Sequence, residues 1–129
     1  MPPSSPAPPT LDKAVRPDKR GGPRWWALVL FTAALAGVVW GSLAPNTPSL
    51  PVSQIDKAQH LAAYALLAAL AYLACRGRSW RAALGLLALG VGIEFAQAAG
   101  GVGREGSVLD VAANTGGVLF ASLAWPRRR

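Results

Sequence analysis

WWALVLFTAALAGVVWGSLA, Trp25–Ala44, is a run of twenty residues without a charged side chain. An α-helix rises about 1.5 Å per residue, so this run would extend roughly 30 Å, about the thickness of the hydrocarbon layer of a bilayer. The run is too long for the apolar part of a cleaved signal peptide. We therefore expect a transmembrane helix that is retained as an anchor.

Three further apolar runs of similar length follow in the 129-residue chain. Hydrophobic residues make up 52% of the sequence and charged residues 15%, against about 25% charged in a typical soluble domain. Lipid is therefore the expected solvent. The sequence predicts an all-α fold, a four-helix transmembrane bundle in one domain, 25–126. The four predicted helices are approximately 25–44, 58–75, 80–99 and 108–125.

Residues 1–24 differ in composition from the rest of the chain. They hold seven of the eleven prolines, together with serine, lysine and arginine. Such a segment lacks the apolar side chains that a folded core needs. We expect a disordered, proline-rich cytoplasmic tail.

The basic residues indicate the orientation of the predicted bundle. Ten of the thirteen lie in the segments before the first helix, between the second and third, and after the fourth, and Arg81 lies in the first turn of the third helix on the same side. Only Lys57 and Arg104 fall on the other side. The positive-inside rule then predicts a multi-pass protein of the inner (cytoplasmic) membrane with both termini in the cytoplasm. Nucleic-acid binding is the other interpretation of basic ends. Charges that bracket lipid-length spans are more simply topological anchors, so no nucleic-acid partner is expected.

Polar and ionisable side chains gather toward the outer ends of the predicted helices. Three of them, Asp56, His60 and Tyr64, follow at i, i+4 and i+8 and so share one helix face. Because a charge in hydrocarbon is costly, such stripes should face one another or water. The candidate site residues are Asp56, Lys57, His60, Tyr64, Glu94, Gln97, Arg104, Asp110 and Asn114.

Helix capping is a second interpretation of two of the acids. Ser53-x-x-Asp56 and Ser107-x-x-Asp110 both fit a capping box with Asp in place of Glu. Glu94 has no such explanation, because it lies near a predicted helix C-terminus, where the helix dipole disfavours an acid. Glu94 therefore needs a partner, and the sequence offers Arg104, Lys57 or His60.

These motifs together resemble the VanZ-like family of small bacterial membrane proteins. The likeness covers roughly residues 30–125 and rests on three blocks in the same order. The blocks are Asp56-Lys57-x-x-His60-x-x-x-Tyr64, Glu94-x-x-Gln97, and Arg104 followed by Asp110-x-x-x-Asn114-x-x-Gly117. The glycine-rich stretch before Arg104 departs from the aromatic stretch of many relatives. The resemblance implies the four-helix fold and a shared polar site, with a link to glycopeptide-antibiotic tolerance.

Three functions fit this pattern. The first is recognition of an anionic cell-envelope lipid, its headgroup or a wall precursor, since helix N-termini with Lys57 and Arg104 favour phosphate. The second is an outer-leaflet acid/base enzyme acting on a lipid-linked envelope precursor, with Asp56, His60 and Glu94 as candidate catalytic residues. The third is a structural or regulatory partner of a membrane complex, or a homo-oligomer, because glycines in the last two predicted helices allow close helix contact.

No cofactor and no metal are expected from the sequence. His60, Glu94 and Asp110 could in principle ligate a metal, but their wide separation in sequence makes that signal weak. The single cysteine, Cys75, excludes an internal disulfide.

Overall fold

The computed structural model describes residues 22–44, 53–99 and 106–126. Within these ranges the chain forms four helices and no strand, which confirms the predicted all-α class. The helices are α1 (Trp25–Leu43), α2 (Ser53–Ala74), α3 (Trp80–Ala98) and α4 (Val108–Ala124). The predicted tail, apart from residues 22–24, and Arg104 lie outside the described residues.

The predicted start of the second helix was wrong by five residues. The predicted start is residue 58, where the apolar run begins, but α2 starts at Ser53. Hydropathy marks the apolar length of a helix, whereas a helix extends as far as its backbone hydrogen bonds continue. Asp56 therefore lies in the first turn of α2, where its negative charge is favourable to the helix dipole.

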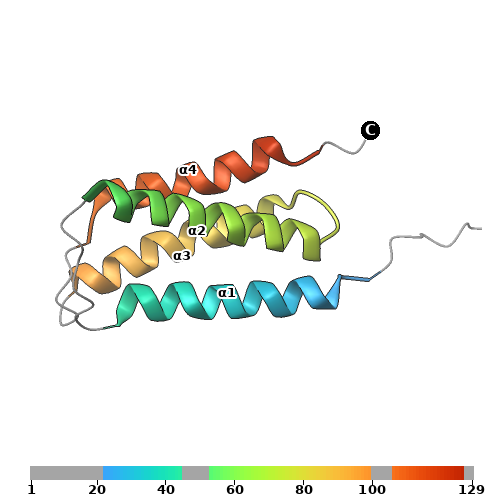
Figure 1. The fold of residues 1–129 in the computed structure, drawn as a ribbon, viewed down its shortest axis with the longest axis horizontal. Coiled ribbons are helices and arrows are strands. Elements are labelled where there is room, and N and C mark those ends of the chain that lie inside the picture. Colours follow the sequence, from blue (N-terminus) through green and yellow to red (C-terminus); the bar gives the residue numbers. More distant parts are fainter. Residues whose placement is uncertain (1–21, 45–52, 100–105, 127–129) are drawn as a thin grey trace, which may run out of the picture.

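The four helices run up and down along one axis (Figure 1). The start of α1 and the end of α4 lie at one end of the bundle, and the starts of α2 and α4 lie at the other. A Schellman-type turn ends α2 and begins the short connection to α3. Gly77 N–H donates to Tyr72 O (2.9 Å) and Arg76 N–H to Leu73 O (3.2 Å), with Arg76 in the left-handed region at φ 56°.

Helix α2 occupies the centre of the bundle and packs against the other three helices, most extensively against α4. Its side chains Tyr64, Leu67 and Tyr72 are the largest members of the buried core. The close approach of α4 depends on Gly117. A Cβ atom there would collide with Leu61 O and lie 2.9 Å from Ala65 N, both backbone atoms of α2.

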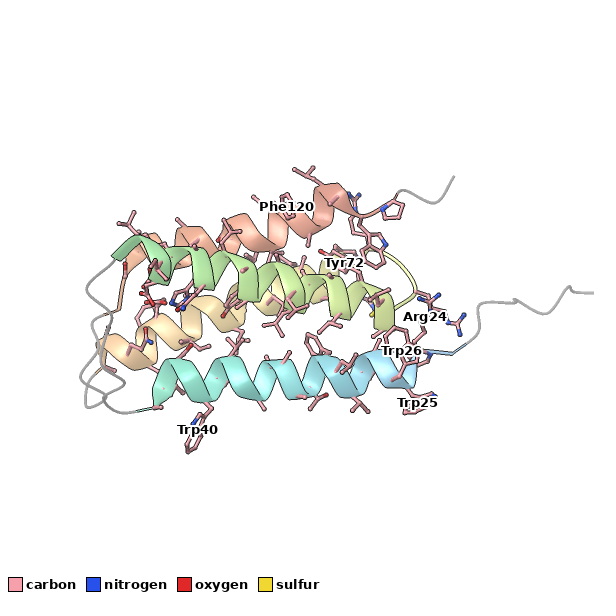
Figure 2. All side chains as sticks on the ribbon, viewed as in Figure 1. Arg24, Trp25, Trp26, Trp40, Tyr72 and Phe120 are labelled. Carbon is pink, nitrogen blue, oxygen red and sulfur yellow. The ribbon has the colours of Figure 1, made fainter. Side chains whose placement is uncertain are left out.

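The exterior of the bundle is rich in large apolar side chains. Trp40 is 77% exposed and Leu123 is 79% exposed. Figure 2 shows Trp25, Trp40 and Phe120 directed away from the bundle. Two helices, α1 and α3, are long and apolar enough to cross a membrane, and α4 is a shorter apolar helix. This surface is typical of a protein that meets a membrane or another apolar partner.

Candidate functional site

Buried polar side chains collect at one end of the bundle, where α2 and α4 begin and α1 and α3 finish. Polar groups removed from water need hydrogen-bond partners, so such a concentration inside an apolar bundle requires a structural or functional reason. The buried polar residues are Ser42, Glu94, Gln97, Asp110 and Asn114. Four of these five were predicted as site residues.

At this end of the bundle, the polar contact between α2 and α4 involves two pairs of residues spaced i, i+4. Asp56 and His60 of α2 face Asp110 and Asn114 of α4. His60 Nδ1 lies 3.1 Å from Asn114 Oδ1, and His60 Nε2 lies 3.9 Å from Asp110 Oδ2. Ligating atoms of Asp56, His60 and Asp110 all lie within 4.8 Å of one another. The two stripes seen in the sequence therefore meet.

The Asn114 amide determines which ring nitrogen of His60 carries a proton. An amide oxygen can only accept a hydrogen bond, so Nδ1 of His60 must donate to Asn114 Oδ1. In the neutral imidazole, Nε2 then presents a lone pair toward the carboxylate of Asp110. Two acceptors that face each other are unfavourable unless a proton or a cation lies between them.

Tyr64 lies one turn below His60 and is 1% exposed. Its neighbour on α3 is Gly90, where an added Cβ would lie 3.3 Å from Tyr64 Oη and 3.2 Å from Asn114 Nδ2. Sequence analysis noted the glycines for helix packing but did not place Gly90 in the site. Gly90 lies four residues before Glu94 and therefore on the same face of α3, and this spacing could have indicated that Gly90 belongs to the site.

Glu94 joins the end of α3 to the start of α4. Its Oε2 accepts a hydrogen bond from Ser107 N–H at 2.7 Å. The sequence offered Arg104, Lys57 or His60 as partners, whereas the partner seen here is a backbone N–H that has no sequence signature. Ser107 is the N-cap residue of α4, but its side chain makes no capping hydrogen bond. The predicted capping box at Ser107 and Asp110 is therefore wrong.

Gln97 joins α3 to α1. Its Nε2 donates to Ser42 O at 2.8 Å, and both residues are buried. Ser42 was not among the predicted site residues, because a backbone acceptor cannot be recognised from side-chain chemistry. Gln97 and Glu94 thus hold the polar end together by contacting different neighbours, rather than joining the group around His60 as the sequence suggested.

A cavity of about 190 Å³ lies between α1 and α2 at this end. The predicted stripe Asp56, His60 and Tyr64 lines it together with Gln59. Its opposite wall on α1 includes Gly37 and Gly41, whose missing side chains leave the space open. The volume is sufficient for several water molecules or for part of a polar headgroup. Lys57 is half-buried nearby in the first turns of α2.

Three buried oxygen atoms at this end have no hydrogen-bond partner among the described residues: Tyr64 Oη, Glu94 Oε1 and Asp110 Oδ1. Each such atom costs about 1–3 kcal/mol if it stays unsatisfied. Two of the three belong to carboxylates, which accept hydrogen bonds or bind cations. The site is therefore suited to a ligand that brings donors or positive charge.

Comparison of the chain with protein-family models, curated proteins and solved structures finds no match.

Proposed function

We propose that the chain is a VanZ-like integral membrane protein whose four helices span the bilayer. The apolar exterior and the lengths of α1 and α3 support this proposal. Arg24, Arg76 and Arg78 mark the end of the bundle opposite the polar site. By the positive-inside rule that end faces the cytoplasm and the polar site faces the outer surface.

The polar end then recognises the headgroup of an anionic cell-envelope lipid. The observation that carries this proposal is the set of three buried oxygens without a hydrogen-bond partner in the described part of the chain, Tyr64 Oη, Glu94 Oε1 and Asp110 Oδ1. Sugar hydroxyl or amide groups of a headgroup would donate to the carboxylate oxygens. The phosphate would lie toward Lys57 and the N-termini of α2 and α4, where backbone N–H groups favour anions. A phosphate-bearing wall precursor carries both kinds of group.

The cavity between α1 and α2 offers such a ligand a route from the bilayer. Gly37 and Gly41 lie on one face of α1, so that no side chain of these residues closes the cavity from that helix. A lipid headgroup could enter between the helices while its chains remain in the membrane. His60, Asp56 and Tyr64 would line its path.

Lipid mass spectrometry of the gently extracted protein tests this function. We expect one class of phosphate-bearing lipid to be enriched over the bulk membrane. Gly37→Leu fills the cavity without altering a polar group, and should reduce the enrichment at least about tenfold, equivalent to 1.4 kcal/mol of binding free energy. Gly92→Leu on exposed α3 is the matched control, because a Cβ at Gly92 also meets nothing within 4 Å.

Equal enrichment in wild type and Gly37→Leu would contradict the proposed route. A lipid profile identical to that of the bulk membrane would contradict headgroup recognition itself. Conversion of the enriched lipid during incubation with the purified protein would favour the enzyme hypothesis, in which His60 is a proton-transfer group.

A further inference from the structure

We infer that Asp56, His60 and Asp110 form a binding site for a divalent transition-metal ion, with zinc the preferred occupant. Two carboxylates and one imidazole each offer a ligand atom there, and all three atoms lie within 4.8 Å of one another. This inference goes beyond headgroup recognition and does not depend on it.

The spacing of these ligand atoms is close to that of a zinc site. Zinc binds imidazole nitrogen and carboxylate oxygen at about 2.0–2.2 Å, so two ligands at a tetrahedral angle are about 3.4 Å apart. His60 Nε2 and Asp110 Oδ2 are 3.9 Å apart. The three ligand atoms lie within 4.8 Å of one another, so each pair would have to approach by about 1.4 Å or less to reach that spacing.

The tautomer of neutral His60 that fits its hydrogen bond to Asn114 is also the one that a metal ligand requires. Because Nδ1 donates to Asn114 Oδ1, the lone pair of the neutral ring lies on Nε2, the nitrogen that faces Asp110. Metal-bound histidines usually donate their second ring N–H to an oxygen acceptor, which fixes the orientation of the ring. Asn114 would be that positioning residue, four residues after the ligand Asp110 on α4.

An independent observation comes from Asp110. The residue is only 8% exposed, yet its Oδ1 is buried without a hydrogen-bond partner in the described structure. A buried carboxylate oxygen without a hydrogen-bond partner is costly, and a bound cation relieves the cost directly. A metal ion would also separate the Asp110 carboxylate from the Nε2 lone pair of His60.

The ligand set indicates the kind of metal. Imidazole suits zinc and neighbouring first-row ions, whereas magnesium and calcium prefer oxygen ligands alone. Three protein ligands leave a fourth tetrahedral position for water or another small ligand. Asp56 and His60 line the 190 Å³ cavity. The fourth position on the metal would therefore have free space beside it.

Zinc chloride titrated into the chelator-treated full chain by calorimetry tests the site. The protein must carry no histidine tag, since His60 is the only histidine of the sequence. We expect one zinc ion per chain. His60→Gln and Asp110→Asn should each weaken binding more than about 100-fold, and Asn114→Ala about 10–100-fold, as expected for a residue outside the ligand set. Asp56→Asn is the second carboxylate variant if Asp110→Asn does not yield folded protein.

Cys75→Ser is the matched control. Cys75 is the only thiol of the sequence, and fifteen residues along the helix axis place it roughly 22 Å from His60. The control should bind zinc as tightly as wild type, and cobalt should give the same visible spectrum in both. Undiminished zinc binding in His60→Gln, or loss of binding in Cys75→Ser, would overturn the assignment. Because the titration contains no lipid, its failure is distinct from failure of headgroup recognition.

Discussion

Gly117→Ala is expected to separate α4 from α2 and to lower the free energy of unfolding by roughly 3 kcal/mol, the upper end of the usual range for overpacking. Alanine is normally better than glycine inside a helix by about 1 kcal/mol. Here the added Cβ would collide with Leu61 O and lie 2.9 Å from Ala65 N. Backbone atoms cannot rotate away, so the helices must move apart.

The measurement is the apparent Tm of the detergent-solubilised protein. This Tm is the temperature at which half of the monodisperse chromatographic peak is lost. A fall of about 10 °C or more is expected. Gly116→Ala is the control on the neighbouring residue, since its Cβ would meet only Leu61 Cδ1, at 3.7 Å. Gly116→Ala should match or exceed the wild-type Tm. Equal Tm values for the two variants would contradict the close α2–α4 contact on which the site depends.

Glu94→Ala is the second substitution with a large expected effect. The Glu94 carboxylate is 6% exposed and accepts from Ser107 N–H, so its removal disconnects α3 from the start of α4. A hydrogen bond to a charged group contributes about 1.5–3 kcal/mol, and we expect a loss of stability in that range. Lipid enrichment should fall as well, because Glu94 Oε1 is one of the three unpartnered oxygens.

Two variants control for the loss of the Glu94 side chain. Glu94→Gln retains an oxygen acceptor for Ser107 N–H and should recover most of the stability but not the lipid enrichment. Glu105→Ala removes an acid that the sequence places in a solvated loop, and its effect should stay within about 0.5 kcal/mol. If Glu94→Ala and Glu105→Ala were equally mild, burial of Glu94 would not matter to the protein.

Helical periodicity predicted the part of the site that depends on one helix at a time. The i, i+4, i+8 spacing placed Asp56, His60 and Tyr64 on one face of α2, and all three line one cavity. The i, i+4 spacing of Asp110 and Asn114 likewise placed both on the face of α4 that meets His60. These inferences need only the geometry of an α-helix.

Contacts between helices were harder to predict, because periodicity does not say which neighbour a face meets. Gln97 contacts Ser42 O on α1, and Glu94 contacts Ser107 N–H. Both partners are backbone atoms, so no residue type in the sequence indicates them. Hydropathy also failed at the start of α2, since the polar residues from Ser53 onward are helical although they precede the apolar run.

The proposed metal ligands Asp56, His60 and Asp110 also come from two helices, so helical periodicity alone does not bring them together. The sequence points only weakly to a metal site at His60, Glu94 and Asp110, because these residues are far apart in the chain. The fold replaces Glu94 by Asp56 in the group of close ligand atoms. A site shared between two helices depends on how the helices pack, and here the backbone of α2 lies close to Gly117 of α4.

We propose that the bundle spans the membrane with the Asp56–His60–Asp110 end outside. Labelling with a membrane-impermeant maleimide tests it most directly, because Ile55 and Cys75 lie at opposite ends of α2, twenty residues or about 30 Å apart. Both are exposed in the structure. We predict that Ile55→Cys in a Cys75→Ser background is labelled in intact spheroplasts. Native Cys75 should be labelled only after permeabilisation. Equal labelling of both positions before permeabilisation, or the reverse pattern, would contradict the account.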